Sequence, residues 1–583
     1  MEDNKDKQQI FLFAAVLILF AGCIRFIGLT ILPLSNNEAY SALQALQIFS
    51  VRAPNEITIP IYTVLTGVNF SIWGASDFLA RLWPALIGSL VVLLPFGFRK
   101  FLGNRTAIIF AFCLAVDPVF IAASKQVNGT IMACFFIFFT IMALINKKHV
   151  LGGVLAVFTI LSGASVWLGV LSLAVAYLLN KLLSSRPNDN DQKNNVQLIP
   201  IVEFGKKDWL NVGKGAVIGI VLIGTIIFTK PELLSGLVSG FVEFVKGWGR
   251  VSNVTILSLL FIIVAYEFIP FVLGGLAIAR GIKENHPVEL ALARWMLVST
   301  LLVVFYPAHQ LFDLIWLAIP LLILASRQIE RIAYLLKKLQ GPDFAYGALV
   351  AVLLVFSLLS AGSFINQISG SVEYIRGLVG MVAGIVLIAV TALLVAWGWQ
   401  AGTSKKGLLL GFLFVGILVG FSTSMRSAGL SRYPAAELWN SSSIPVDADI
   451  VTSTINDMSL WKTGLPESLS ILRAGDLSAS MAWYFRNYKN FSTTLEVPGG
   501  NLSDIVINDG AALSSQAAYR GQDFVWERTM QKKDVKVVDW IKWLLFRKAN
   551  YNDRTIVLWF RTDLFPGYVP ENNTFDQPLL PSK

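Results

Sequence analysis

Apolar runs of about 17 to 25 residues recur along the chain as far as residue 425 and then stop. A run of that length, coiled as an α-helix, matches the roughly 30 Å hydrocarbon core of a bilayer. The composition agrees, because 55% of the 583 residues are hydrophobic and 14% are charged, whereas soluble domains are about a quarter charged. The sequence therefore predicts an α-helical, polytopic integral membrane protein.

About thirteen segments are predicted to span the membrane. They lie near 10–33, 78–98, 106–122, 129–146, 149–162, 164–183, 212–229, 252–279, 290–306, 310–325, 346–365, 376–398 and 407–425. Residues 34–75 form a long external loop with two amphipathic stretches, 37–50 and 60–74. The first stretch is too polar and the second too short to span, so both are predicted to be helices on the membrane surface.

The positions of Lys and Arg predict the topology. Lys5 and Lys7 precede the first span and place the N-terminus in the cytoplasm. The loops at 99–105, 147–148, 206–207 and 405–406 are also cationic and fall on the same side. The net charge of +10 is therefore interpreted as a topology signal, and no nucleic-acid partner is expected. The three cysteines lie inside apolar runs, which argues against a disulfide framework.

The composition changes near residue 430. The β-rich runs 503–509 and 554–560 alternate with helical patterns at 477–488 and 537–546, which is typical of a small α/β domain. Because thirteen spans is an odd number, this domain is predicted to be extracytoplasmic. The expected organisation is a transmembrane domain at 1–429 and a soluble domain at 430–583.

A polar tetrapeptide, Ser35-Asn36-Asn37-Glu38, follows the first span directly. One interpretation is a helix cap, because Ser and Asn are good N-cap residues and an acidic side chain favours the positive end of a helix. The other interpretation is a functional site at the external membrane face. The residues that follow the tetrapeptide bear on this choice.

Three further motifs follow in order. They are a proline-containing surface helix at 60–74, a Gly-x-Ser-x-x-x-x-Arg entry (74–81) into the second span, and a Ser124-Lys125 turn before the fourth. In this order and spacing the chain resembles the GT-C membrane glycosyltransferases, in particular the protein O-mannosyltransferase and lipid A aminoarabinose transferase group. The resemblance covers residues 10–150 and extends to the later spans through their number and layout. The segments "MAWYFRNYKN" and "LWFRTDLFPG" also look like the tails of bacterial members.

The resemblance implies which residues carry the chemistry. The tetrapeptide of the family ends in Asp-Glu, and here Asn37 and Glu38 occupy those places; a second acidic position of the family falls near Asn128–Gly129. An asparagine can orient an acceptor hydroxyl, but it cannot take its proton and is a poor ligand for a hard cation. Glu38 is therefore the expected catalytic residue, assisted by Asn37. If a divalent metal ion takes part, Glu38 or Glu56 would hold it.

Cationic residues at the external face are candidates for binding the substrate. Arg81 and Lys125 would contact the phosphate of a lipid-linked donor and stabilise it as a leaving group; the alternative is that both extend to water from the interface. Asn128 would contact the acceptor. His309 is a further candidate because an ionisable group at membrane depth suggests function; the alternative is a local pair with Asp313.

The resemblance implies a glycosyltransferase that moves a sugar from a polyprenyl-phosphate donor to a lipid, glycan or protein acceptor at the outer membrane face. One alternative keeps the fold without the chemistry, as an accessory protein or scaffold in envelope glycan assembly, and Asn37 and Asn128 favour it. The other alternative is a transporter. Against a transporter, the spans show no matching pair of Gly/Pro-broken segments.

Overall fold

The computed structural model describes residues 2–50, 57–184, 204–252, 254–367, 371–431, 434–496, 503–510, 518–532 and 535–565. The chain divides into two compact units. Residues 1–32, 41–441 and 530–550 form the first, called the helical unit, and residues 33–40, 442–529 and 551–583 form the second, called the sheet unit. The predicted division into a transmembrane domain at 1–429 and a soluble domain at 430–583 stays a prediction.

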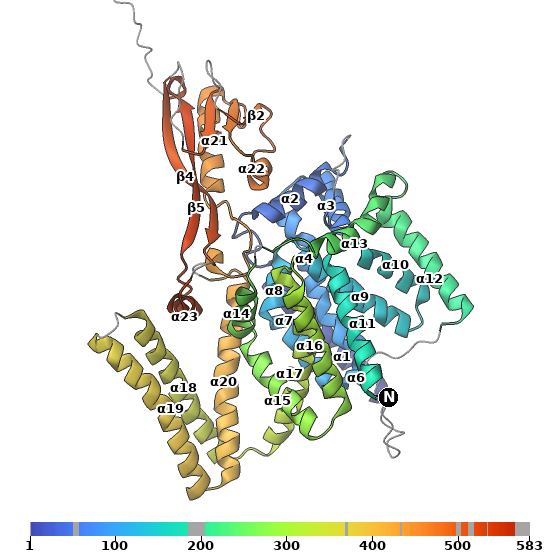
Figure 1. Ribbon diagram of the computed structural model, residues 1–583, viewed down its shortest axis with the longest axis vertical. Helices are drawn as coiled ribbons and strands as arrows, with labels where there is room; N and C mark the ends of the chain where they lie inside the picture. The colour runs from blue at the N-terminus through green and yellow to red at the C-terminus, as the bar shows by residue number, and fades with distance from the viewer. Residues whose placement is uncertain are drawn as a thin grey trace, which may run out of the picture. The chain divides into compact units, whose positions relative to one another are not determined.

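Helices build the first half of the chain. They are α1 (Glu2–Phe26), α2 (Asn36–Gln47), α3 (Pro60–Trp73), α4 (Asp77–Leu90), α5 (Leu94–Gly97), α6 (Arg99–Leu102), α7 (Asn104–Val116), α8 (Pro118–Lys125), α9 (Gly129–Ile145), α10 (His149–Ile160) and α11 (Ser165–Ser184). The surface helices predicted at 37–50 and 60–74 correspond to α2 and α3 (Figure 1).

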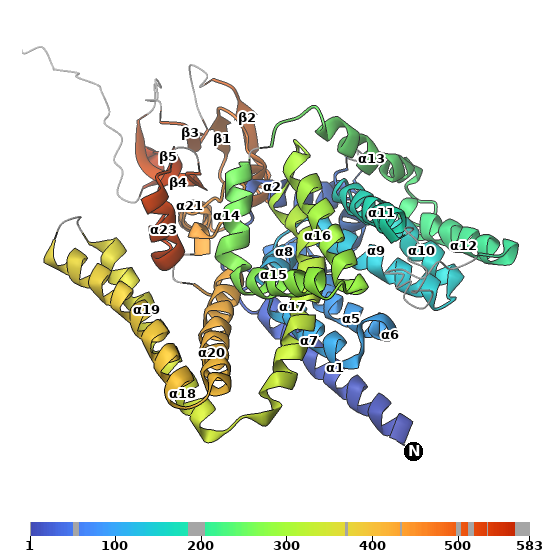
Figure 2. The ribbon, with the colours of Figure 1, turned by 60° about the horizontal axis from the view of Figure 1, so that its bottom comes forward.

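The later part of the helical unit is also built of helices. They are α12 (Lys206–Gly219), α13 (Gly236–Gly247), α14 (Ile256–Tyr266), α15 (Phe268–Lys283), α16 (Pro287–Phe305), α17 (Ile315–Leu335), α18 (Gly341–Asn366), α19 (Val372–Gly398), α20 (Ala401–Ser427) and α23 (Val537–Phe546). Helix α17 is the core of the bundle, because all residues from Ile315 to Ser326 are buried. Helix α18 packs along both α19 and α20 (Figure 2).

Among the described residues, seven helices are long and apolar enough to cross a membrane, and nine if each of two bent pairs counts as one span. Three shorter apolar helices lie at Phe11–Phe26, Gly129–Ile145 and His149–Ile160. The predicted count of thirteen is therefore not confirmed. Segment 212–229 differs most from its prediction: α12 ends at Gly219, a π-turn follows at Ile220–Gly224, and Ile226, Ile227 and Phe228 have positive φ.

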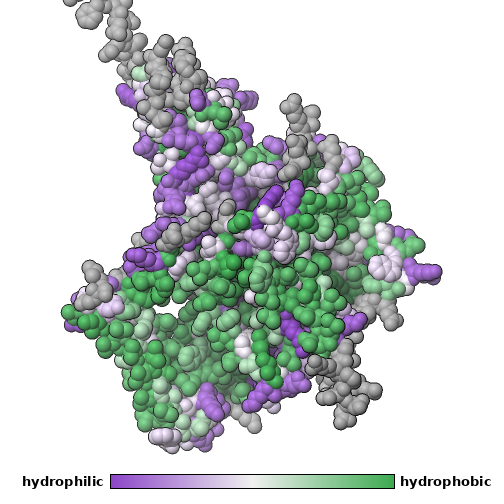
Figure 3. Space-filling view, viewed as in Figure 1, coloured by the Kyte–Doolittle hydropathy of each residue, from purple (hydrophilic) through white to green (hydrophobic). Residues whose placement is uncertain are grey.

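Much of the visible surface of the helical unit is apolar (Figure 3). Hydrophobic side chains cover its visible face, whereas hydrophilic side chains dominate the sheet unit (Figure 3). In α18 and α19, Leu359 is 70% exposed and Trp397 is 85% exposed. Apolar surface on this scale is stable in lipid and not in water. The chain is therefore an integral membrane protein, as predicted.

The sheet unit contains the small C-terminal sheet that the sequence predicts. Its strands are β1 (Ile471–Ala474), β2 (Phe491–Thr494), β3 (Ile505–Asn508), β4 (Tyr519–Met530) and β5 (Tyr551–Arg561), in the order β2-β1-β3-β5-β4. Strand β1 runs parallel to β2 and β3, with Ile471 opposite Ile505, and β3 runs antiparallel to β5. The unit also contains α21 (Ala448–Thr463) and α22 (Ala479–Tyr484). Strands β1 and β3 are buried along their whole length, as central strands with covered faces are.

Candidate functional site

Glu38 lies in the first turn of α2 and is 3% exposed. Its Oε2 accepts hydrogen bonds from the backbone N–H and the hydroxyl of Ser35, both at 3.0 Å. The carbonyl of Ser35 accepts the N–H of Ala39 at 2.8 Å, which begins the helix. A glutamate that reaches back three residues to the N-cap N–H is one half of a capping box. The helix-cap interpretation therefore describes how Glu38 is held, and it leaves a fixed carboxylate.

The asparagines next to Glu38 bind to other parts of the sheet unit. The N–H of Asn36 donates to the carbonyl of Ser443 at 2.9 Å, and Asn36 Oδ1 accepts the N–H of Ser480 at 2.9 Å. The N–H of Asn37 donates to the hydroxyl of Ser442 at 3.2 Å. Asn37 is exposed whereas Glu38 is buried. The start of α2 is thus held by residues of two distant segments, Ser442 and Ser443 in one and Ser480 in the other.

Arg81 and Lys125 converge on the chain that leaves α1. Arg81, in α4, donates through Nη1 to the carbonyls of Leu29 at 2.9 Å and Leu32 at 2.7 Å. Lys125, the last residue of α8, donates to the carbonyl of Ile27 at 2.5 Å and lies within electrostatic range of Arg81. These three carbonyls belong to residues that follow the end of α1 at Phe26, and a buried carbonyl outside a helix needs a hydrogen-bond donor from elsewhere. Both side chains are buried and do not extend to water.

Asn128 is the N-cap of α9, where its Oδ1 accepts the N–H of Ile131 at 3.2 Å. Its Nδ2 donates to the carbonyls of Ala123 at 2.5 Å and Gln126 at 3.0 Å. The side chain therefore closes the turn that follows Lys125 and uses both its acceptor and its donor group to do so. This bonding explains why an amide, with both kinds of group, suits the position.

His309 holds two loops together. Its Nδ1 lies 2.8 Å from the carbonyl of Tyr306, and its Nε2 lies 2.8 Å from the carbonyl of Val254. Asp313 instead accepts from the hydroxyl of Ser165 at 2.5 Å and from the N–H of Gln310 at 2.8 Å. His309 and Asp313 thus have different hydrogen-bond partners, although the two residues lie within electrostatic range of each other.

The candidate residues fall into two groups. Asn37 and Glu38 belong to the sheet unit, and Arg81, Lys125, Asn128 and His309 belong to the helical unit. Their convergence on one cavity stays a prediction, and Glu56 lies outside the described residues. Over the described ranges, no group of three or more His, Cys, Asp or Glu could hold a metal ion.

Sequence reasoning missed the two bends in the membrane-spanning helices. Helices α7 and α8 meet at 51° around Asp117, and α14 and α15 meet at 87° around Glu267. Pro118 ends α7 because it lacks an N–H and restricts the residue before it. Asp117 caps α8 by accepting the N–H of Phe120 at 3.0 Å. The described residues therefore contain two bent pairs of apolar helices. The absence of a matching pair of Gly/Pro-broken segments, which argues against a transporter, stays a prediction.

Arg25 joins both sides of the first bend. Its guanidinium is fully buried and donates to the carbonyls of Leu114 at 3.0 Å and Ala115 at 3.1 Å, and to the hydroxyl of Ser124 at 3.2 Å. The end of α7 and the end of α8 are thus held by one side chain of α1. The sequence marks Arg25 only as a charge inside an apolar run.

Glu267, at the second bend, lies near Asp117, at the first bend. Its carboxyl group is 3% exposed and approaches the carboxyl of Asp117 and the N–H of Val119. Neither of its oxygens completes a hydrogen bond of normal geometry to any described residue. The signal that could have found the pair is an acidic residue inside each apolar run.

Comparison with known proteins identifies the fold. No protein-family model matches the chain, and no curated protein matches its sequence. Among solved structures, the chain is similar to ArnT from Cupriavidus metallidurans in the apo state, with a TM-score of 0.51 at 13% identity over 96% of this chain and 99% of that one. The chain has the fold of ArnT. The predicted resemblance to the GT-C glycosyltransferases is confirmed at the level of the fold.

Two further solved structures have lower TM-scores. ArnT from the same organism bound to undecaprenyl phosphate gives a TM-score of 0.49 at 14% identity, over 96% of this chain and 99% of that one. The oligosaccharyltransferase of Archaeoglobus fulgidus in the apo form gives 0.41 at 12% identity, over 83% of this chain and 64% of that one.

Proposed function

We propose that this chain is an integral-membrane glycosyltransferase that transfers a sugar from a polyprenyl-phosphate donor to a hydroxyl acceptor. The observation that carries the proposal is the fold shared with ArnT over 96% of the chain. The motif order in residues 10–150 supports it independently of the fold. In the proposed topology, the transfer occurs at the outer face and residues 430–583 are extracytoplasmic.

The donor phosphate would bind at Arg81 and Lys125. The ammonium group of lysine has three N–H donors, of which Lys125 gives one to the carbonyl of Ile27. The two buried cations lie within electrostatic range of each other, and a phosphate between them would relieve their repulsion. Charge-assisted contacts would also stabilise the phosphate as the sugar leaves it.

The acceptor hydroxyl would be activated by Glu38. In the proposed step, the acceptor oxygen forms a bond to the anomeric carbon, the bond from that carbon to the phosphate oxygen breaks, and the hydroxyl proton moves to the Glu38 carboxylate. The bonds from Ser35 to Oε2 hold the carboxylate in one orientation. Exposed Asn37 would orient the acceptor through its amide.

The proposed mechanism assigns no divalent metal ion to this position. Both Ser35 donors bind Oε2 of Glu38, and the amide of Asn37 carries no charge to balance that of a cation. No step of the proposed mechanism passes through a metal.

A second function keeps the fold without catalysis, as an accessory protein in envelope glycan assembly. The observation that favours it is Asn128, whose amide is committed to capping α9 and closing the preceding turn. Asn128 thus has a structural role at the position where the family has an acidic residue.

The test is a transfer assay with the purified protein in lipid nanodiscs and a panel of radiolabelled polyprenyl-phosphate sugars. The parent should form labelled product, and Glu38→Gln should not. Glu373→Gln is the matched control, because Glu373 also lies in the first turn of a helix, α19, and is exposed. Transfer by Asn37→Asp with Asn128→Asp, but not by the parent, would establish the accessory function instead.

A further inference from the structure

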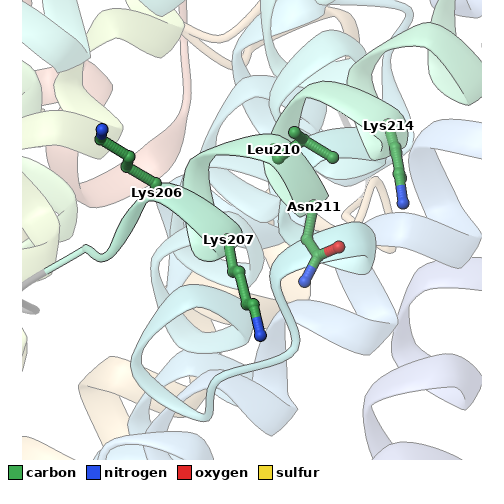
Figure 4. A pocket seen from close by; sticks show the side chains of 5 residues that line it. All are labelled: Lys206, Lys207, Leu210, Asn211 and Lys214. Atoms are coloured by element: carbon green, nitrogen blue, oxygen red, sulfur yellow. The ribbon is translucent and has the colours of Figure 1, made fainter.

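A basic surface lies on α12, in a region that the proposed transfer reaction does not use. Lys206, Lys207, Leu210, Asn211 and Lys214 line a pocket of about 320 Å³. Lys207, Asn211 and Lys214 extend from one side of the helix, and Lys206 extends away from them (Figure 4). All three lysines are exposed. Within the described ranges, no acidic side chain forms an ion pair with any of them.

A different side of α12, with Gly215 and Gly219, is buried against α10. A Cβ atom on Gly215 would lie 2.0 Å from the carbonyl oxygen of Val150, and one on Gly219 would lie 3.0 Å from the Cβ of Val157. Small residues that let two backbones approach this closely are typical of helix pairs in membranes. The packing fixes which face of α12 points outward, and that face carries the lysines.

The one acidic residue of α12 serves the helix start. Asp208 pairs with His149 at 3.1 Å and accepts the N–H of Gly205 at 3.0 Å. The Asp208 carboxylate therefore contacts the first residue of α10 and the N-cap of α12, and it does not neutralise the lysines. The excess charge of the outward face of α12 is positive.

The character of the outward surface changes along the chain from basic to apolar. Trp209 is 63% exposed at the level of the lysines. Beyond Lys214, Val217 is 60% exposed and Ile218 and Leu222 are each 44% exposed. Lysines followed by apolar side chains match the order of headgroup and acyl chain in a lipid leaflet. Exposed Trp209 lies between Lys207 and Lys214 in the sequence, and an exposed tryptophan is typical of the membrane interface.

We infer that the outward face of α12 is a binding site for an anionic phospholipid. The lipid phosphate lies against Lys207 and Lys214, Asn211 donates an amide N–H to it, and an acyl chain lies along Val217 and Leu222. The apolar continuation distinguishes a lipid from a soluble phosphate, which would need the lysines alone. The inference does not depend on the proposed transfer activity.

The test compares binding of phosphatidylglycerol to the full-length protein by native mass spectrometry. Each lysine near an anionic lipid contributes roughly 1 kcal/mol, or about fivefold in affinity. Lys207→Gln with Lys214→Gln should therefore weaken binding at least about fivefold relative to phosphatidylcholine. The charge-matched control is Lys489→Gln with Lys536→Gln, two exposed lysines elsewhere, and it should bind as the parent does.

Three results would overturn the inference. They are unchanged phosphatidylglycerol binding in the α12 variant, an equal loss in the control, and displacement of the lipid from the parent by millimolar inorganic phosphate. If the glutamine variant fails to fold, Lys207→Arg with Lys214→Arg provides the second measurement. This variant keeps the charge, so retained binding supports the lipid site and lost binding contradicts it.

Discussion

Glu38→Gln separates the two roles that Glu38 combines, the cap of α2 and the proposed base. Gln also completes a capping box, and its amide oxygen can accept both Ser35 donors that now bind Oε2. The stability cost should therefore stay below about 1 kcal/mol. The base, by contrast, disappears completely, and loss of one general base costs on the order of a hundredfold in rate. A hundredfold loss corresponds to about 2.7 kcal/mol in the barrier.

Ser35→Ala provides the opposite perturbation. It removes the hydroxyl that donates to Oε2 of Glu38, at a cost of about 1 kcal/mol in stability, but it leaves the carboxylate in place. We expect this variant to melt earlier than Glu38→Gln and to retain more of the transfer rate. The assay measures thermal unfolding and sugar transfer on the same nanodisc preparations.

The losses of transfer rate and of stability in the two variants distinguish a catalytic Glu38 from one that only caps α2. A catalytic Glu38 requires a large rate loss in the more stable variant and a small one in the less stable variant. If both variants lose rate in proportion to stability, Glu38 acts only through the fold of α2. If Glu38→Gln transfers sugar at the parent rate, the proposed base is wrong.

Three further changes test the surrounding structure. Asn128→Asp should destabilise the protein by about 1–3 kcal/mol, measured as a lower unfolding midpoint, because the carbonyls of Ala123 and Gln126 lose their donors; an unchanged midpoint would contradict the capping role. Arg547→Ala should cost roughly 3–5 kcal/mol, since Arg547 donates to the buried Glu437 at 3.1 Å, and chemical denaturation should detect it. The hydrogen bonds from Arg528 hold the pKa of Asp553 below its usual range, so this pair contributes stability above about pH 4 that is lost as the pH falls through the folded pKa. In Asp553→Asn, the unfolding midpoint should fall less as the pH is lowered than it does in the parent. The same pH dependence in both proteins would refute the contribution of the pair.

Local pattern made much of the architecture predictable. The period and length of the apolar segments predicted helices that the structure places at α2, α3, α16, α18 and α19, because helix formation in a membrane depends on nearby residues. The run at 503–509 became β3 and the run at 554–560 became β5. The count of spans was less predictable, since the apolar helices Phe11–Phe26, Gly129–Ile145 and His149–Ile160 are short and α12, which carries charges, ends at Gly219.

The sequence by itself determined that this chain enters a membrane, where most of its helices begin and end, and which ionisable residues lie within them. Only the tertiary structure decided what those residues contact. Arg81 binds the carbonyls of Leu29 and Leu32, and the carboxyl group of Glu267 approaches Asp117, a residue far away in the chain. Helix propensity and hydropathy act over a few turns, whereas these contacts depend on how whole helices pack and on which buried carbonyls still lack a donor.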